Sequence, residues 1–585
     1  MRIAKLFGII SVLILSYLSA SALFSPGFFP MHDDTQVARV FEMGRALKDG
    51  MFPVRWVSDL GYGFGYPIFN FYSPLSYYVG GFLNILGFDA LFATKLMMGT
   101  GIILSGIFMY LLAKEFWGKL GGLISALFYV YAPYHAVQIY VRGDVGEFWA
   151  YSFIPLVFLG FYKIFKSSQN KTSNAWKWVA ISALGLAGLI LSHNLTAMMI
   201  APFLLIMIAV LSFISYRNKN VLNAFFIILA AIFGLLLAAF YWLPALVEMK
   251  YTNVLSQIGG GADFRDHFVC VQQLWNSQWG FGGSTKGCID GMSFKIGKLS
   301  IILSFAAFML AIFILTKNKF NHFNDTYHYS DRAKIIFISF GGLIFSILLM
   351  LGISGPIWET IKPMEFFQYP WRFLILVSFF SSILAGSLVF SIQAITIKTK
   401  NLKTAWYLSG IIMVFFLMYF NLKLFKPQTI SSRDSFHYTN EFSLRWTTSK
   451  ISDEYMPKSF YKPQNEQEII SNKFYGQKKG FRVLNQEIKS NKIKAELVLP
   501  IDDKVTIKLS HFPSWNLYVN GKESPFTQVY DGYSLNLPKG EYVLEAKFEE
   551  TLIEKLGNVL SLIGLFTLFI GIIYGLKTKD VAKKS

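Results

Sequence analysis

Two adjacent carboxylates, Asp33 and Asp34, follow the first apolar stretch of the chain, in the phrase FPMHDDTQVARVFEMGRALKDGMFPVRW at residues 29–56. Carboxylates at a membrane surface can remove a proton as a general base or can orient a metal ion. Asp33 could instead cap an amphipathic helix, because Gln36 follows it at the spacing of a capping box. Capping would account for one acid only, so the pair is a candidate for catalysis.

Further residues that could do chemistry lie where predicted helices end. Arg142 and Arg372 could bind a phosphate, because the planar guanidinium donates two hydrogen bonds at once. The same helix ends carry five more candidates for contact with a substrate: Glu147, His193, Asn194, Gln368 and Trp371. Ionisable groups at membrane depth are candidates for function by default.

Each of these residues also has a purely structural interpretation. Arg142 could belong to an ion cluster with neighbouring acids, which would contribute about 0–1 kcal/mol if it were exposed. Glu147 could stabilise the N-terminus of a helix, and His193 could be a satisfied polar residue in a turn. Trp371 and Arg372 could anchor the end of a helix at the membrane interface.

The composition indicates a membrane protein. Of the 585 residues, 54% are hydrophobic and 15% are charged, whereas soluble domains carry about a quarter charged residues. Apolar runs long enough to cross a bilayer recur along most of the chain. We predict about twelve transmembrane helices, near residues 5–25, 90–113, 120–137, 148–166, 177–192, 195–215, 221–246, 297–316, 335–353, 371–396, 405–424 and 556–577.

The basic residues predict an orientation. Short loops rich in Lys and Arg face the cytoplasm, and alternate loops of this chain carry them from end to end. Both termini are therefore expected in the cytoplasm of a multi-pass protein of the cell membrane. The net charge of +19 is then a topology signal rather than a sign of nucleic-acid binding. The first segment could also be a cleaved signal peptide. The segments expected outside are 26–89, 247–296, 354–370 and 425–555.

Three parts follow from this reading: a transmembrane domain at residues 1–424, an extracytoplasmic domain at 425–555, and a final helix with a basic tail at 556–585. Alternation with period two indicates a β-sandwich from about residue 481, and Asn520-Gly521 indicates a two-residue hairpin turn. Cys270 and Cys288 lie in one outer loop, where they could form a disulfide or remain free thiols.

A fixed order of phrases connects these features: HDDTQVAR, KDGMFPVRW, GYGFGYPIFNFYSPLSYY, YVRGDVGEFW, LSHNLTA, FFQYPWRF, HFPSWNLYVNGKE and LPKGEYVLEAKF. In this order the phrases resemble the GT-C superfamily of membrane glycosyltransferases, and among them the bacterial YfhO-like membrane proteins. The resemblance covers most of the chain. Some YfhO-like proteins carry a name that refers to 6-pyruvoyl-tetrahydropterin synthase, although nothing in this chain resembles a soluble pterin enzyme.

The resemblance implies transfer of a sugar from a polyprenyl-phosphate donor to a glycan, lipid or protein acceptor at the outer membrane face. By motif position, Asp33 would be the general base with Asp34 in support, and both would have to lie near Arg142 and Arg372. A divalent cation, Mg²⁺ or Mn²⁺, could take part, but a second acid motif for a metal is missing and its ligands are unknown. The segment NFYSPL also lacks the lysine that many members carry before this position.

Two other functions fit the same composition. A transporter or flippase of lipid-linked sugars would place polar sites at mid-membrane, in broken helices and internal repeats, and we find no repeat. A non-catalytic envelope protein could use residues 425–555 to bind glycans, and this segment could equally be a passive lid.

Overall fold

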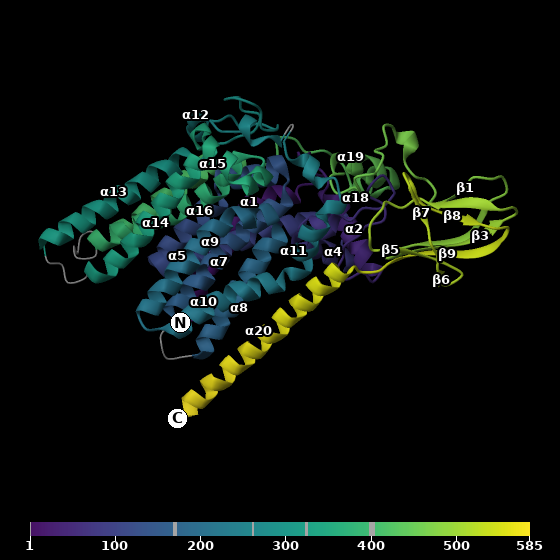
Figure 1. The fold of residues 1–585 in the computed structure, drawn as a ribbon. Coiled ribbons are helices and arrows are strands. Elements are labelled where there is room, and N and C mark those ends of the chain that lie inside the picture. The colour runs from purple at the N-terminus through teal and green to yellow at the C-terminus, as the bar shows by residue number, and fades with distance from the viewer. Residues whose placement is uncertain (1, 168–171, 260–261, 322–325, 397–403, 585) are drawn as a thin grey trace.

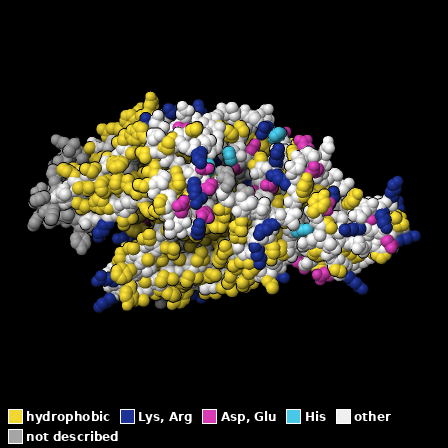
Figure 2. Space-filling model, turned by 45° about the horizontal axis from the view of Figure 1, so that its top comes forward, with side chains coloured by type: hydrophobic (Ala, Val, Ile, Leu, Met, Phe, Trp, Pro, Cys, Tyr) yellow, Lys and Arg dark blue, Asp and Glu magenta, His cyan; other side chains and the backbone are white. Residues whose placement is uncertain are grey.

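The structure is a computed structural model that describes residues 2–167, 172–259, 262–321, 326–396 and 404–584. The molecule is elongated, with a bundle of long helices at one end and two β-sheets at the other (Figure 1). Short helices lie between the two parts. Hydrophobic side chains gather over the helical bundle, whereas charged side chains gather towards the sheets and around a hollow in the face that Figure 2 shows.

The chain is an integral multi-pass membrane protein. Nine of the described helices are long and apolar enough to cross a membrane, or ten if α10 and α11, which meet at 64°, form one span. The long helices and their bounds are α1 (Arg2–Ala20), α5 (Ala90–Val130), α7 (Val145–Lys166), α8 (Thr172–Ser192), α9 (Asn194–Arg217), α10 (Val221–Leu237), α11 (Ala239–Glu248), α13 (Lys298–Asn321), α14 (Thr326–Met350), α16 (Leu374–Thr396), α17 (Ala405–Asn421) and α20 (Leu552–Lys584).

The predicted number of twelve transmembrane helices is not confirmed. The apolar part of the first helix, Gly8–Phe24, includes most of α1 and is shorter than the nine helices that could cross a membrane. The two spans predicted at residues 90–137 fall largely in one helical element, α5. That element is broken at Gly118, whose φ of 74° favours glycine. A Cβ on Gly122 would lie 2.9 Å from the Cα of Lys114, so the chain reverses its direction at the break.

Short helices connect the bundle to the sheets and cover the ends of the long helices. Those between the bundle and the sheets are α2 (Gln36–Lys48), α3 (Ile68–Phe71), α4 (Leu75–Ile85), α18 (Ser435–Thr439) and α19 (Ser449–Ile451). Those at the ends of long helices are α6 (Pro133–Val137), α12 (Val271–Trp275) and α15 (Gly355–Thr360).

Nine strands of the described chain form two antiparallel sheets, in the orders β1-β4-β8-β7 and β2-β3-β9-β5-β6. The predicted hairpin turn joins β5 to β6 at Asn520-Gly521, where φ values of 48° and 79° match a type I′ turn. The strands are β1 (Phe474–Gly476), β2 (Arg482–Ile488), β3 (Lys492–Leu499), β4 (Asp503–Ile507), β5 (Trp515–Val519), β6 (Lys522–Glu523), β7 (Thr527–Val529), β8 (Gly532–Leu537) and β9 (Gly540–Phe548).

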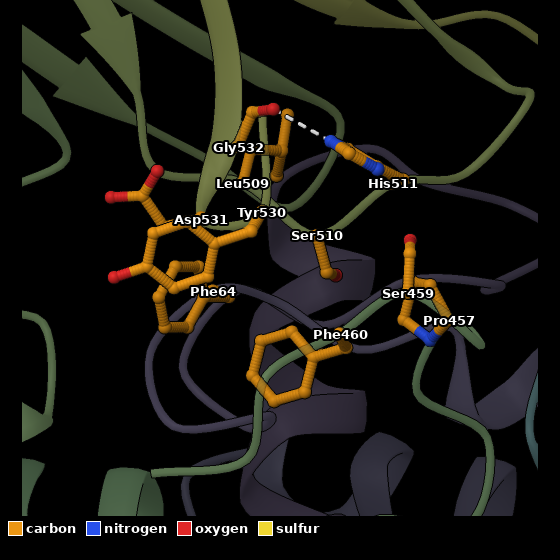
Figure 3. Close-up of a pocket in the computed structure, with 10 residues that line it drawn as sticks. All are labelled: Phe64, Pro457, Ser459, Phe460, Leu509, Ser510, His511, Tyr530, Asp531 and Gly532. Carbon is orange, nitrogen blue, oxygen red and sulfur yellow. Dashed lines mark hydrogen bonds between the residues drawn. The ribbon is translucent and has the colours of Figure 1, made fainter. Parts of the chain in front are cut away.

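The segment 26–89 docks onto the sheets through a buried aromatic cluster. The ring of Trp56, which is 1% exposed, lies 5.4 Å from that of Trp515 and 6.3 Å from that of Phe548. A cavity of about 10 Å³ beside Phe64 has room for about one water molecule, and Figure 3 shows its lining. The contact is therefore closely packed, and it fixes the segment that carries the acid pair.

Candidate functional site

Main-chain pairing places the first acid next to the first arginine. The amide of His32 donates to the carbonyl of Val141 at 3.0 Å, and the amide of Asp33 donates to the carbonyl of Arg142 at 2.9 Å. The side chain of Gln36 also donates to the carbonyl of Asp33 at 3.0 Å. The segment that carries the acid pair is therefore bound to the residues that precede α7.

The interpretation of Asp33 as a helix cap is wrong. Helix α2 begins at Gln36 after Thr35, and no side chain caps its first turn. Gln36 does not complete a capping box: its Oε1 accepts from the hydroxyl of Tyr77, and its Nε2 donates to the carbonyls of Asp33 and Gly143 at 3.0 and 2.8 Å. The carboxylate of Asp33 therefore takes no part in capping α2, and its hydrogen-bond partner is His32 Nδ1 at 3.0 Å.

Arg142 is the centre of a buried ion cluster. Its guanidinium donates to Glu147 Oε2 at 2.6 Å and to Asp144 Oδ2 at 2.8 Å. It also lies 4.7 Å from the ring centroid of Trp371. The sequence was also compatible with an exposed ion cluster of little energetic value, but Arg142 is only 7% exposed. Breaking this cluster would therefore leave a buried charge without a partner.

Glu147 joins three parts of the chain. It is 1% exposed and accepts hydrogen bonds from the hydroxyl of Tyr134 and from Gln138 Nε2, the latter at 3.0 Å. Its Oε2 also lies 3.8 Å from the Nε of Arg372. The arginine before α7 and the arginine before α16 thus meet at one carboxylate.

Two buried donors at this meeting point have no acceptor. The Nε of Arg372 and the Nε1 of Trp371 are buried without a hydrogen-bond partner in the described chain, and the two residues are 7% and 3% exposed. The Trp371 ring stacks on that of Tyr369 at 5.0 Å, next to Gln368, whose φ is 61°. Buried donors without acceptors cost free energy, so this position favours a ligand that supplies oxygen atoms.

His193 and Asn194 lie at the start of α9 and serve largely local contacts. Nδ1 of His193 accepts the amide of Thr196 at 3.2 Å, which caps the helix. Its ring lies against Gly146, where a Cβ would be 3.3 Å from His193 Cδ2. Burial lowers the pKa of His193, although the charge of Asp144 opposes the shift. The main-chain N–H of Asn194 donates to Ser73 Oγ at 3.2 Å.

The two acids of the pair have different surroundings. The side chain of Asp33 is 38% exposed and lies 3.0 Å from His32 Nδ1. Burial acts to raise the pKa of Asp33, but the hydrogen bond from His32 and the charge of Arg142 together hold it below its usual value. Asp34 instead faces Arg433 at 3.4 Å. Burial raises the pKa of Asp34 to about 6, although Arg433 acts to lower it.

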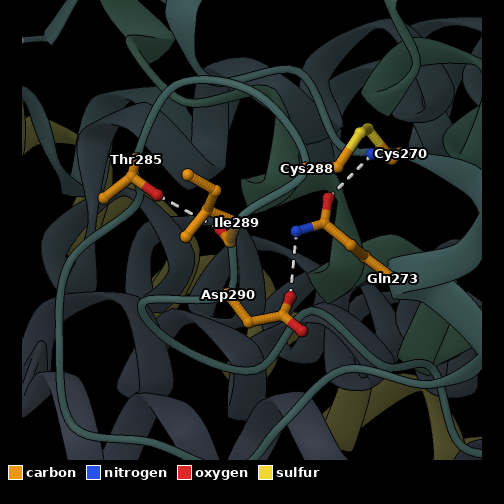
Figure 4. The surroundings of a disulfide bond; sticks show 6 residues. All are labelled: Cys270, Gln273, Thr285, Cys288, Ile289 and Asp290. Carbon is orange, nitrogen blue, oxygen red and sulfur yellow. Dashed lines mark hydrogen bonds between the residues drawn. A yellow bond between two sulfur atoms is a disulfide. The ribbon is translucent and has the colours of Figure 1, made fainter.

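The predicted disulfide between Cys270 and Cys288 is present (Figure 4). The loop that it closes reaches the acid pair, because a Cβ on Gly283 would lie 3.8 Å from His32 Nε2. Within the same loop, Ser284 Oγ lies 2.9 Å from Nδ1 of His267, and the ring of His267 is 4.8 Å from that of Tyr369. The loop therefore borders the site on two sides.

Sequence reasoning missed two arginines of this region. Arg39 is 4% exposed, donates to Ser452 Oγ at 2.8 Å and lies 4.4 Å from the ring centroid of Tyr72. Its charge also lowers the pKa of Asp33. The second is Arg433, the partner of Asp34. Arg39 is the last residue of the phrase HDDTQVAR, so its place in that motif could have identified it. Nothing in the irregular segment 425–480 pointed to Arg433.

A divalent cation has no ready-made site here. Across the residues that the structure describes, no three His, Cys, Asp or Glu side chains are arranged to hold a metal ion. Asp33 and Asp34, the adjacent acids of the candidate site, face His32 and Arg433 respectively.

Fold and site together define a polytopic helical membrane protein with a polar centre at the ends of its helices and two antiparallel sheets beside it. Residues 69–424 match the model of a family described as the 6-pyruvoyl-tetrahydropterin synthase related domain, a membrane protein. The chain belongs to this family, as the sequence resemblance predicted.

Individual relatives are distant. An uncharacterized protein of Lactococcus lactis subsp. cremoris (strain MG1363) is 27% identical over 303 residues, which cover 50% of this chain and 46% of the relative. The match therefore spans less than half the length of that protein.

Two solved structures show partial likeness. One is the oligosaccharyltransferase AglB of Archaeoglobus fulgidus in complex with an inhibitory peptide and a dolichol-phosphate, with a TM-score of 0.46, 13% identity, and coverage of 79% of this chain and 62% of that one. The other is ArnT of Cupriavidus metallidurans bound to undecaprenyl phosphate, with a TM-score of 0.36, 9% identity and coverage of 76% of each chain. At these scores the likenesses assign no activity to this chain.

Proposed function

We propose that this chain is a GT-C type glycosyltransferase, which moves a sugar from a polyprenyl-phosphate donor to a glycan, lipid or protein acceptor. One observation carries the proposal: Arg142 and Arg372 meet at Glu147 beside Asp33, and the Nε of Arg372 is buried and finds no acceptor among the described residues. A carboxylate that can act as a base, near a cationic donor that lacks an acceptor, suits sugar transfer from a phosphate.

The reaction uses Asp33 as the base. Its carboxylate takes the proton of the acceptor hydroxyl while that oxygen attacks the anomeric carbon of the donor sugar. A glycosidic bond forms, the bond from the anomeric carbon to the phosphate oxygen breaks, and polyprenyl phosphate leaves with the electron pair. Because the pKa of Asp33 lies below its usual value, the carboxylate is ionised at neutral pH.

The two arginines have different roles in this proposal. Arg142 already makes charge-assisted hydrogen bonds to two carboxylates, at 2.6 and 2.8 Å, so its charge is largely compensated. The nearest carboxylate oxygen to Arg372 is at 3.8 Å. Arg372 is therefore the group that binds the departing phosphate, with Trp371 Nε1 as a second donor, and Arg142 is a positioning residue.

The remaining predicted residues support this centre. Glu147 holds both arginines, and Asp34 fixes Arg433 at the edge of the site. His193, Asn194 and Gln368 lie on the segments that border the centre and shape the space for the donor. The stacked rings of Tyr369 and Trp371 offer an aromatic face to a sugar ring or a lipid chain.

The test is transfer of label from a radiolabelled polyprenyl-phosphate sugar by the purified full chain in lipid nanodiscs. Asp33→Asn should lower the rate about 10²–10⁴-fold, the usual contribution of a general base. Arg372→Lys should lower it about 10²–10³-fold through loss of the fork-shaped donor. Asp263→Asn, which changes a partly exposed acid that pairs with Arg265 in the neighbouring loop, is the matched control and should transfer label at the parental rate.

Two outcomes would overturn the proposal. If Asp33→Asn transferred label like the parent, Asp33 would not be the base. If reconstituted vesicles moved the lipid-linked sugar across the bilayer without a new glycosidic bond, the chain would be a transporter. The polar centre favours the enzyme, because its residues precede α7 and α16 rather than lying in the middle of a span.

A further inference from the structure

A polar cavity lies at the end of the helical bundle opposite to the candidate site. Helix α7 begins next to the candidate site and runs for 22 residues, or about 33 Å, enough to cross the hydrocarbon core of a bilayer. At its far end a cavity of about 320 Å³ opens between α7, α9 and α10. Its polar lining consists of Lys166, Ser167, Ser215, Asn218, Asn220 and Asn223.

The cavity contains a buried hydroxyl without a partner. Ser215 is 3% exposed, and its Oγ has no hydrogen-bond partner in the described part of the chain. Asn223, which is 8% exposed, donates to the carbonyls of Phe165 and Ser167 only at 3.3 and 3.4 Å. Because buried polar groups normally find partners, these groups indicate a polar ligand.

The charges around the cavity select an anion. Lys166 is exposed, and no carboxylate of the described residues pairs with it. The N-terminus of α10 also faces this region, with Asn220 as its cap, and the first amides of a helix attract negative charge. A volume of this size is that of a small-ligand pocket, so a phosphate with a few further polar atoms fits it.

The surroundings favour a membrane lipid as the source of the phosphate. Apolar side chains next to the cavity are exposed, among them Phe213 at 61%, Val221 at 58% and Phe225 at 54%. Such side chains offer a surface for acyl chains. We propose that this cavity binds the phosphate of an anionic lipid headgroup, with Lys166 and Ser215 as ligands of the phosphate oxygens and the asparagines as partners of headgroup hydroxyls.

The test measures the thermal midpoint of the detergent-purified full chain with added phosphatidylglycerol, phosphatidylcholine or inorganic phosphate. We expect phosphatidylglycerol to raise the midpoint, with little effect from the other two. Lys166→Ala and Ser215→Ala should each weaken the phosphatidylglycerol response about tenfold in lipid concentration, the loss expected for one charge-assisted hydrogen bond. Arg217→Ala removes an exposed charge from the same turn, outside the lining, and should keep the parental response.

Each other outcome decides against the proposal. An equal response to inorganic phosphate would identify a soluble phosphate compound as the ligand. An equal loss in Arg217→Ala would indicate general surface charge rather than this cavity. Unchanged responses in both Lys166→Ala and Ser215→Ala would exclude the cavity as the binding site. Sugar transfer at the opposite face is a separate activity, so neither result depends on the other.

Discussion

Arg142 and Arg372 face the same carboxylate, that of Glu147, although one precedes α7 and the other precedes α16: Arg142 donates a hydrogen bond to it, and Arg372 lies within ion-pair distance. Their guanidinium nitrogens lie 2.6 and 3.8 Å from Glu147 Oε2. Because Glu147 is 1% exposed, water cannot replace either arginine. This shared contact ties together two helices that are distant in the chain, and it holds positive charge beside Asp33.

Removal of that carboxylate charge should destabilise the protein. Glu147→Gln leaves the buried Arg142 with one acid instead of two, and breaking a buried ion pair costs about 3–5 kcal/mol. The change is measured as the free energy of unfolding in detergent. Glu115→Gln is the control, because Glu115 pairs with Lys163 at 3.1 Å and is 34% exposed, so its loss should cost about 0–1 kcal/mol. Equal losses would contradict a special role for Glu147.

Asp34 should make stability depend on pH. Its folded pKa of about 6 lies above the ordinary value, so the folded chain holds this proton more tightly than the unfolded chain. Stability should therefore fall as the pH rises from about 4 to about 6, and the Asp34 contribution should then stay constant.

The substitution Asp34→Asn should remove that slope. The neutral amide avoids the cost of a buried charge, so the variant should be more stable than the parent at pH 7 by on the order of 1–3 kcal/mol. Thermal midpoints measured between pH 4 and pH 7.5 test this expectation. Asp263→Asn, at a partly exposed acid of the outer loop, should leave the slope as it is. Parallel pH profiles for Asp34→Asn and the parent would show that Asp34 does not carry the effect.

The sequence could predict that the candidate residues share one end of the bundle. Arg142, His193 and Arg372 all lie where helices end, and alternate helix ends must share a membrane face. The family resemblance placed Asp33 near Arg142, and the pairing of their main chains is what the structure adds. The number of helices was harder to predict. Between the predicted spans 90–113 and 120–137 we expected a loop, whereas the chain is helical there except at Gly118, where it reverses its direction.

Contacts made by the irregular segment could not be predicted. Residues 425–480 have no periodicity, so nothing indicated that Arg433 would reach Asp34 or that Ser452 would cover Arg39. Such contacts depend on how the segment folds back over α2, and only the three-dimensional packing decides that. The sequence therefore suggested that Asp33 and Asp34 act together, whereas in the structure Asp33 contacts His32 and Asp34 contacts Arg433.

Trp56 should hold the sheets on the membrane domain. Its buried ring packs against both Trp515 and Phe548, and Trp→Ala changes in packed cores cost about 3–5 kcal/mol. In Trp56→Ala, hydrogen exchange of β5 and β9 and cleavage within residues 425–555 by added protease should both become faster. Trp275→Ala, at a ring that is 43% exposed, is the control. The docking role of Trp56 would be refuted if the two variants exchanged and were cleaved alike.

The disulfide should keep the loop in place beside the acid pair. Cys270 and Cys288 are separated by 18 positions, and closing a loop of about 15 residues restricts the unfolded chain by about 3 kcal/mol. The double change Cys270→Ala with Cys288→Ala should therefore lower the thermal midpoint and speed proteolysis between the two positions. A reductant should reproduce both effects in the parent and add nothing to the double variant. If the reduced parent resisted protease like the oxidised one, contacts such as Gly283 with His32 would hold the loop without the covalent bond.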